Sequence, residues 1–388
     1  MRSKNYPEGE EDRAARPPAY ERILIAGLGL IGGSFALALR RSGYRGRIAA
    51  VSRPESLAEG RRLGAIDEGS TYEDLPKAAT EADLIVLASP IERIIEHLNA
   101  LGRVPLRPGT VVTDVGSTKR EIMAAARSLP AGVHFIGGHP MAGSEKRGMA
   151  AADPFLFQNA YYILTGPDGG PTAPFDRLGD FIRDRTGARV VALSAERHDR
   201  IAAAISHLPQ LLAVALVNSL GDLGPLRDDA VRLAAGGFRD MTRIASSPYE
   251  VWRDILSTNH HEIAAALDRF VARLGDAKSL ITSGAAGDEG VARRFQEAGS
   301  TRAAIPRDTK GFLRPLSEVL VVVEDKPGMI AGIAGVLARK GINIKDIEVL
   351  KVREGEGGSL RLAFAARTEA EEAVRILQEA AYTARARD

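Results

Sequence analysis

The segment from His134 to Glu145 reads HFIGGHPMAGSE and holds the residue types that chemistry most often uses. It places an imidazole at His139, a hydroxyl at Ser144 and a carboxylate at Glu145 in a glycine-rich loop that follows a short apolar strand. Loops of this kind commonly carry catalytic and binding residues. A neutral imidazole accepts hydrogen bonds and protons near neutral pH, so the segment predicts acid–base chemistry.

A second cluster lies near the start of the chain and fits the pattern G-x-G-x-x-G. It follows an apolar strand, Ile23 to Ala26, and opens a helix-length segment, Ser34 to Arg41. In this context the first glycine permits a tight turn, the second lets a pyrophosphate approach, and the third packs helix against strand. The alternative is a structural glycine turn. We expect a dinucleotide to contact Gly27, Leu28, Gly29, Leu30, Ile31 and Gly32.

The residues after the second strand bear on the choice of cofactor. NAD sites usually have an acidic residue there, which binds the ribose 2′-hydroxyl, but this chain has Ser52 and Arg53. A hydroxyl beside a guanidinium suits a 2′-phosphate, so the sequence leans towards NADP or dual use with NAD. The alternative is that Arg53 stacks on adenine or lies in solvent.

Both clusters require a sheet that aligns them. Apolar runs alternate with helical segments, which is typical of a parallel, doubly wound α/β sheet. We expect strands at Ile23 to Ala26, Ile48 to Val51, Leu84 to Ala88, Val111 to Asp114, His134 to Ile136, Tyr161 to Thr165 and Arg189 to Leu193.

The character of the chain changes after Ser194, a predicted N-cap with Glu196 in the first turn. Alanine- and leucine-rich helices should then run to about Thr282, followed by a linker. From Leu316 the pattern predicts a ferredoxin-like βαββαβ unit with helices at Met329 to Lys340 and Glu369 to Ala381.

Composition excludes several classes of protein. With 388 residues and 45% hydrophobic content, the chain can form two or three domains with buried cores. A net charge of +2 and the lack of a basic block argue against nucleic-acid binding, and the absence of cysteine excludes disulfides and cysteine-based metal sites. We expect no metal site. The polar first 19 residues are no signal peptide, and apolar runs such as Leu208 to Val217 are too short to span a membrane, which favours a cytoplasmic protein.

Three motifs together resemble the prephenate dehydrogenase family: Asp114-Val-Gly-Ser-Thr-Lys119, the segment from His134 to Glu145, and Ser206-His-Leu-Pro209. The resemblance covers about Glu21 to Leu280. It implies oxidative decarboxylation of prephenate to 4-hydroxyphenylpyruvate, with hydride transfer to NAD(P)+, in tyrosine biosynthesis. It also implies a homodimer formed through the helical domain.

The resemblance assigns roles to residues near the reacting carbon. His139 matches the family histidine that accepts a hydrogen bond from the ring hydroxyl, and the alternative is a structural loop histidine. Ser117 matches a serine that bonds this histidine and lies by the nicotinamide, with a plain turn serine as the alternative. We also expect Ser89, which follows the strand that ends at Ala88, to contact the cofactor.

The substrate carries two carboxylates, so its site requires cations. Arg239 and Arg243, at i and i+4 of an expected helix, could grip carboxylates bidentately, and Arg243 matches the family position for this contact. A solvated helix face is the alternative for both. The resemblance also assigns to the substrate site His207, before the helix-bending Pro209, together with Ser144, Glu145 and Asp199. A satisfied core histidine and a solvated carboxylate are the alternatives for His207 and Glu145.

The C-terminal unit resembles an ACT domain, an amino-acid-sensing module, through Glu324-Asp-Lys-Pro-Gly-Met-Ile and Gly341-Ile-Asn-Ile. The resemblance places Gly328, Met329 and Asn343 near a bound amino acid, and tyrosine is the natural feedback ligand. A dimerisation unit that has lost its ligand is the alternative. The expected organisation is a disordered leader (1–19), an NAD(P)-binding Rossmann-like domain (20–193), an all-helical substrate and dimerisation domain (194–298), a linker (299–315) and an ACT domain (316–388).

Two rival functions remain open. An arogenate or broad cyclohexadienyl dehydrogenase would differ in accepting an amine in place of the keto group of the side chain. A non-catalytic amino-acid sensor that keeps a bound nucleotide is a more remote alternative. Such a sensor has no need of Ser117, His139, His207 and Arg243 together.

Overall fold

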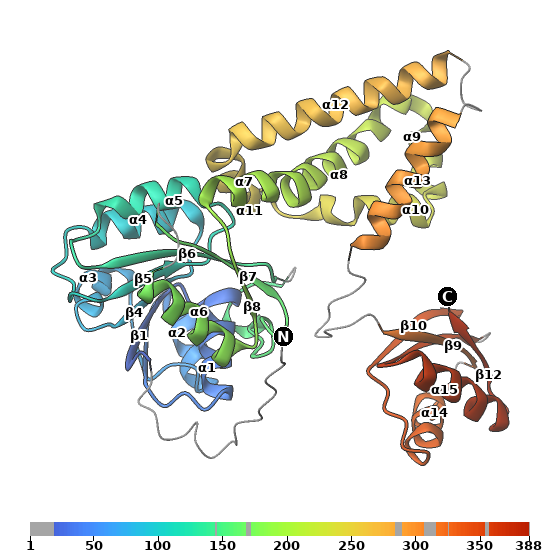
Figure 1. The fold of residues 1–388 in the computed structure, drawn as a ribbon, viewed down its shortest axis with the longest axis horizontal. Helices are drawn as coiled ribbons and strands as arrows, with labels where there is room; N and C mark the ends of the chain where they lie inside the picture. Colours follow the sequence, from blue (N-terminus) through green and yellow to red (C-terminus); the bar gives the residue numbers. More distant parts are fainter. Residues whose placement is uncertain are drawn as a thin grey trace, which may run out of the picture. The chain divides into compact units, whose positions relative to one another are not determined.

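The computed structural model describes residues 19–143, 146–167, 172–283, 289–305, 316–324, 326–353 and 357–387. The chain forms two compact units, Met1–Val291 and Ala292–Asp388, which are described separately. The first unit holds an α/β domain followed by a helical domain, and the second holds a small sheet covered by helices (Figure 1).

An eight-stranded sheet forms the centre of the α/β domain, in the order β3-β2-β1-β4-β5-β6-β7-β8. Every strand expected from the sequence is present. The chain turns from one side of β1 to the other between β3 and β4, which creates the switch point where such sheets bind ligands. The strands are β1 (Arg22–Ala26), β2 (Arg47–Val51), β3 (Glu68–Ser70), β4 (Leu84–Leu87), β5 (Val111–Asp114), β6 (His134–Pro140), β7 (Tyr161–Thr165) and β8 (Arg189–Ala192).

The expectation of a parallel sheet is correct for every pair except β6 and β7, because β7 and β8 pair in parallel with each other but run opposite to the other strands. β6 pairs with β5 in parallel over His134–Ile136 and then with β7 in antiparallel fashion over Gly137–Pro140. His139 therefore lies within a strand, opposite Ile163, and the predicted loop begins later than expected. A longer β6 holds the imidazole on a hydrogen-bonded backbone, which positions it more rigidly than a loop would.

Apolar side chains alternate along β1 and supply a core on each face of the sheet. Ile23 and Ile25 pack on one face against α1 (Leu30–Arg41), α2 (Pro54–Arg62) and α6 (Ala173–Thr186). Leu24 and Ala26 pack on the other face against α3 (Leu75–Ala79), α4 (Ile91–Leu101) and α5 (Arg120–Ala125). Both faces are covered, as the doubly wound fold requires.

The helical domain begins where the sequence predicts. Ser194 caps α7 (Ala195–Ala202), because its hydroxyl accepts a hydrogen bond from the backbone N–H of Arg197. The chain continues through η5 (Ala203–His207), α8 (Leu208–Asn218), η6 (Ser219–Leu226), α9 (Arg227–Leu233), α10 (Gly236–Thr242), η7 (Arg243–Ser246), α11 (Tyr249–Thr258) and α12 (His260–Thr282).

Helix α11 attaches the helical domain to the α/β domain. Ile255 is buried in the core beside α4, and the Asp254 carboxylate accepts a hydrogen bond from the backbone N–H of Glu92 at 3.2 Å. Arg253 pairs with Glu92 in the same contact. The two domains of this unit are therefore held together by apolar packing as well as polar contacts.

The second unit has the βαββαβ order predicted from the sequence. After α13 (Glu289–Ala304) come β9 (Ser317–Val323), α14 (Met329–Ala338), β10 (Asp346–Arg353), β11 (Gly357–Phe364), α15 (Arg367–Glu379) and β12 (Thr383–Arg387). The sheet order is β10-β11-β9-β12, and all its pairs are antiparallel. Val319, Val321 and Leu362 form its core with Ile333 and Leu377 from the two helices.

Candidate active site

The three glycines after β1 each meet a different steric requirement. Gly27 has φ +103°, and a Cβ there would lie 2.5 Å from the carbonyl oxygen of Ala88. A Cβ on Gly32 would lie 2.1 Å from the carbonyl oxygen of Gly27, so only glycine lets α1 pack this closely. Gly29 faces open space, because a Cβ placed on it would have no atom of the described residues within 4 Å. These features fit a dinucleotide whose pyrophosphate approaches Gly29 at the start of α1.

The remaining residues predicted for the cofactor surround this cradle. The Ser52 hydroxyl is buried and accepts a hydrogen bond from the N–H of Leu28 at 3.0 Å, so it braces the glycine turn. Arg53 is exposed at the start of α2. The Ser89 hydroxyl donates to the carbonyl of Ala26 at 3.2 Å, which places it beside the turn at the end of β4.

The predicted reacting residues lie at the same edge of the sheet as the glycine cradle. β1, β4, β5 and the first half of β6 run parallel, so their carboxyl ends meet at one edge. Ser117 follows β5 and His139 lies near the end of β6. No hydrogen bond joins Ser117 to His139 among the residues described. The Nδ1 atom of His139 instead contacts Nε2 of His198 at 2.8 Å.

A buried ion pair fixes the backbone on both sides of this edge. Lys119 and Asp114 pair with fully buried side chains, and the Lys119 ammonium also donates to the carbonyl of Gly138 at 2.7 Å. The Asp114 carboxylate accepts N–H bonds from Gly116 at 2.7 Å and Gly138 at 2.9 Å. The pair therefore holds the turn that carries Ser117 against the strand residue that precedes His139.

The surroundings of His139 keep its imidazole neutral. Burial lowers the pKa of His139 well below its usual value, and His198, Lys119 and His207 lower it further as neighbouring positive or ionisable groups. Burial also lowers the pKa of Lys119, although Asp114 opposes that shift. A neutral His139 can accept a hydrogen bond or a proton from a substrate hydroxyl at neutral pH.

His207 is also held inward. The turn η5 is π-helical, and the following Pro209 lacks the backbone N–H that a regular helix would use. His207 is 1% exposed, its Nδ1 atom lies 3.2 Å from the Asn259 amide, and its ring meets Trp252 edge to face. Burial lowers its pKa to about 4.

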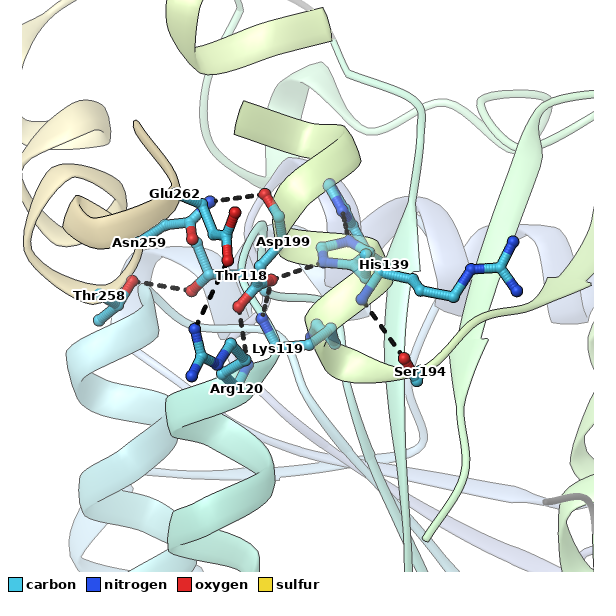
Figure 2. Close-up of polar contacts among 12 residues, drawn as sticks. Thr118, Lys119, Arg120, His139, Ser194, Asp199, Thr258, Asn259 and Glu262 are labelled. Carbon is cyan, nitrogen blue, oxygen red and sulfur yellow. Dashed lines mark hydrogen bonds and ion pairs between the residues drawn. The ribbon is translucent and has the colours of Figure 1, made fainter. Parts of the chain in front are cut away.

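Asp199, which the resemblance assigns to the substrate site, is held by contacts within the protein. Its side chain is fully buried, and it accepts hydrogen bonds from the backbone N–H groups of Lys119 at 2.7 Å and Arg120 at 2.9 Å. The Asn259 amide donates to the Asp199 carbonyl at 2.9 Å (Figure 2). A carboxylate that is buried in this way positions its neighbours.

The two predicted arginines lie on separate elements. α10 ends at Thr242 and Arg243 opens the 3₁₀ turn η7, so Arg239 and Arg243 do not share one regular helix face as expected. Both side chains are exposed on the helical domain. Ser144 and Glu145 lie outside the described residues.

Sequence reasoning missed three residues of this site. His198, Asn259 and Thr258 join its parts: Thr258 and Thr118 share a hydroxyl hydrogen bond of 2.8 Å (Figure 2). A histidine beside an aspartate in the first turns of a helix was a signal for His198. Asn259 and Thr258 carry no such signal, since their partners are more than 50 residues away.

A cavity of about 1030 Å³ also opens in this unit. Its lining includes Arg120, His134, Ser194, Asn259 and His260, but none of the residues predicted for cofactor or substrate. The chemistry described above is therefore not located in this cavity.

The fold, the glycine cradle and the neutral imidazole beside it define an oxidoreductase of the Rossmann type that uses a nicotinamide dinucleotide. Three family descriptions match the chain: the nucleotide-binding domain of prephenate dehydrogenase over residues 35–192, its dimerization domain over 194–297, and an ACT domain over 317–381. This chain belongs to the prephenate dehydrogenase family.

Individual relatives agree with this assignment. The chain is 36% identical to prephenate dehydrogenase of Bacillus subtilis, over 89% of this chain and 92% of that protein. A structure of prephenate dehydrogenase from Aquifex aeolicus with hydroxyphenyl propionate and NAD+ is 33% identical, with a TM-score of 0.67 over 74% of this chain and 98% of that one. The structure of Synechocystis arogenate dehydrogenase is 30% identical, with a TM-score of 0.64 over 73% and 99%.

Proposed function

We propose that this chain catalyses the oxidative decarboxylation of prephenate to 4-hydroxyphenylpyruvate. The observation that carries the proposal is the neutral His139 at the sheet edge that also bears the glycine cradle. Family membership supplies the substrate class, and the Aquifex relative binds an aromatic carboxylate together with NAD+. The protein must hold the ring hydroxyl, the two carboxylates and the dinucleotide in the correct relative positions.

His139 accepts the proton of the ring hydroxyl as the carbon that bears it becomes carbonyl-like. A nicotinamide held by the glycine cradle would supply the acceptor for the hydride from that carbon. The ring carboxylate then leaves as carbon dioxide, its bonding electrons restore the aromatic ring, and the proton returns from His139 to the phenolic oxygen. Ser117 lies beside this centre, and His207, Arg243 and Arg239 are proposed to bind the substrate carboxylates.

The direct test compares His139→Gln with His134→Gln, which changes an exposed histidine on the same strand. We expect the first to lose at least a hundredfold in kcat, because its amide cannot take up a proton, and the second to keep wild-type turnover. Prephenate-dependent reduction of the dinucleotide is the measurement. Wild-type turnover by His139→Gln would refute the proposed role.

Arogenate is the second candidate substrate, favoured by the similarity to Synechocystis arogenate dehydrogenase. The two substrates differ only in the keto or amino group of the side chain. Assays of the purified protein with each substrate at matched concentrations decide between them. We expect a higher kcat/KM with prephenate, and the opposite order would reassign the substrate.

For the cofactor, we propose NADP or dual use with NAD. Arg53 supports this lean, since it is exposed at the start of α2, directly after β2. Arg53→Ala should raise KM for NADP and leave KM for NAD unchanged, whereas Arg62→Ala on the same helix should change neither. At least tenfold preference of the wild type for NAD would contradict the proposed use of NADP.

The helical domain is proposed to form a homodimer. Leu226, Leu233 and Met241 have side chains 63%, 77% and 68% exposed, although they are apolar. Contrary to the expectation from the sequence, the helical stretch 195–233 is long and apolar enough to cross a membrane; it contains a window of mean hydropathy 1.6, of which only 28% is buried. A second copy of this domain would cover this apolar surface, and we propose a cytoplasmic enzyme without membrane contact. Sedimentation should give a dimer that Leu233→Glu weakens and that Leu63→Glu, on the α/β domain, leaves intact.

The ACT domain is proposed to bind tyrosine and to inhibit the enzyme. Gly328 has φ +91° at the start of α14, Met329 opens that helix, and Asn343 is exposed just after Gly341. These positions leave backbone and amide groups available to an amino acid. Millimolar tyrosine should lower activity and raise Tm, and Asn343→Ala should lose both effects. If tyrosine neither lowers the activity nor raises the Tm of the wild type, the proposal is refuted.

A further inference from the structure

An unbroken chain of hydrogen bonds runs from His139 into the helical domain. Nδ1 of His139 lies 2.8 Å from Nε2 of His198, and Nδ1 of His198 lies 2.7 Å from the Asp199 carboxylate. His198 is 1% exposed and Asp199 is fully buried. Neither the sequence motifs nor the family resemblance gave His198 a role.

With Asp199 as a carboxylate and His198 neutral, each of these bonds has one direction. A carboxylate only accepts, so Nδ1 of His198 carries the proton in its bond to Asp199. The Nε2 atom of a neutral His198 is then an acceptor, and Nδ1 of His139 must be the donor. A neutral His139 with a proton on Nδ1 has none on Nε2. That nitrogen is the one left to face a substrate hydroxyl.

We propose that His198, oriented by Asp199, is a positioning residue that holds His139 in the tautomer with an unprotonated Nε2. The inference rests on the proposed function, since the tautomer matters only if His139 accepts a proton from the substrate. It also gives a role to the burial of Asp199 within the protein.

The surroundings of Asp199 keep it an acceptor. One of its oxygens accepts the N–H of Lys119 as well as His198, and the other accepts the N–H of Arg120. All three contacts come from N–H donors, so both oxygens of Asp199 act as acceptors. The negative charge lies within the chain that leads to His139, and it is fixed by backbone atoms that cannot rotate away.

The same chain of hydrogen bonds stabilises the positive charge that forms on His139 during turnover. When the Nε2 atom of His139 takes the hydroxyl proton, the ring becomes an imidazolium that donates through Nδ1 to His198. The charged groups around it are Lys119, paired with Asp114, and Asp199, while His198 and His207 are the other ionisable neighbours. Lys119 opposes the imidazolium and Asp199 favours it. Each proton stays bonded to a nitrogen or returns to the product oxygen, so the step balances.

His198→Phe is the most informative variant. It removes the hydrogen-bond chain and leaves Nδ1 of His139 without an acceptor, so nothing holds the proton on that nitrogen. His198→Gln restores an acceptor near His139 without a proton relay.

The tautomer can be read without activity from the ¹⁵N shifts of histidine-labelled protein, which has seven histidines. We expect a protonated Nδ1 on His139 in the wild type and in His198→Gln, and the loss of this preference in His198→Phe. A protonated Nε2 on wild-type His139 would overturn the proposal. Because this measurement needs no substrate, it stays informative even if the protein turns over neither prephenate nor arogenate, a result that would refute only the proposed function.

Kinetics give the second test. His198→Phe should lower kcat roughly hundredfold, with KM for prephenate and Kd for the dinucleotide changed less than threefold, while His198→Gln recovers part of kcat. His134→Gln should match the wild type. Equal losses of kcat and of dinucleotide affinity would indicate a merely structural role, and kcat within threefold of wild type in His198→Phe would refute the positioning role.

Discussion

Replacing Lys119 by methionine should destabilise the fold through the charge it leaves behind. Lys119 and Asp114 are both fully buried, and the ammonium also bonds the Gly138 carbonyl at 2.7 Å. Removing one partner of a buried ion pair costs about 3 to 5 kcal/mol. The Asp114 carboxylate keeps two backbone N–H donors, from Gly116 and Gly138, so we expect the lower part of that range, about 3 kcal/mol.

Urea unfolding followed by the fluorescence of Trp252, the chain's single tryptophan, measures this loss. Trp252 packs against the core beside α4, so it reports on the unit that holds the pair. At about 2 to 4 °C per kcal/mol for a unit of this size, Tm should fall by roughly 10 °C. kcat should fall as well, because Gly138 precedes His139.

Two controls separate the buried charge from the change of side chain. Lys77→Met, on the exposed surface of α3, should change stability by less than about 0.5 kcal/mol. The double variant Lys119→Met with Asp114→Asn has no buried charge left and should be more stable than Lys119→Met alone. A loss below about 1 kcal/mol in Lys119→Met, or a double variant less stable than the single one, would refute the reasoning.

Three further outcomes are expected. Arg243→Ala should raise KM for prephenate about 10- to 100-fold with little change in kcat, since a distal carboxylate is held equally in ground and transition states. Arg239→Ala should raise KM by less. A loss mainly in kcat for Arg243→Ala would contradict this expectation. Gly32→Ala should weaken dinucleotide binding at least tenfold in a fluorescence titration, because its Cβ would lie 2.1 Å from the Gly27 carbonyl oxygen; unchanged affinity would show that the loop can shift freely. The pKa of His207 falls to about 4 on folding, so the folded state binds fewer protons than the unfolded state below pH 6.5. The free energy of unfolding should therefore decrease by up to about 3 kcal/mol as pH falls from 6.5 towards 4. A urea midpoint equal at pH 7 and pH 5 would contradict this expectation.

Much of this fold could be predicted because its signals are local. The glycine pattern from Gly27 to Gly32 specifies a turn through backbone sterics within six residues. Ser194 caps α7 through an N–H only three residues away, and the βαββαβ order of the C-terminal unit follows from short alternating runs. The inward placement of His207 could also be predicted, since Pro209 disturbs its own helix.

Other features were decided only by tertiary contacts. The strand β6 extends through His139 because β7, more than 20 residues later, pairs with it in antiparallel fashion. The helix expected to carry both arginines ends at Thr242, between Arg239 and Arg243, and no breaker residue stands between them to signal this.

The sequence by itself determined the residue types of the active site, the cofactor cradle and the family. Only the tertiary structure decided how His139 is held. His198 lies 59 residues from His139 along the chain and Asp199 lies 80 from Lys119, yet all four meet in one network. A pattern of residues encodes its own helix or strand, whereas the tautomer of a histidine depends on which donor or acceptor the folded chain brings within about 3 Å of its ring.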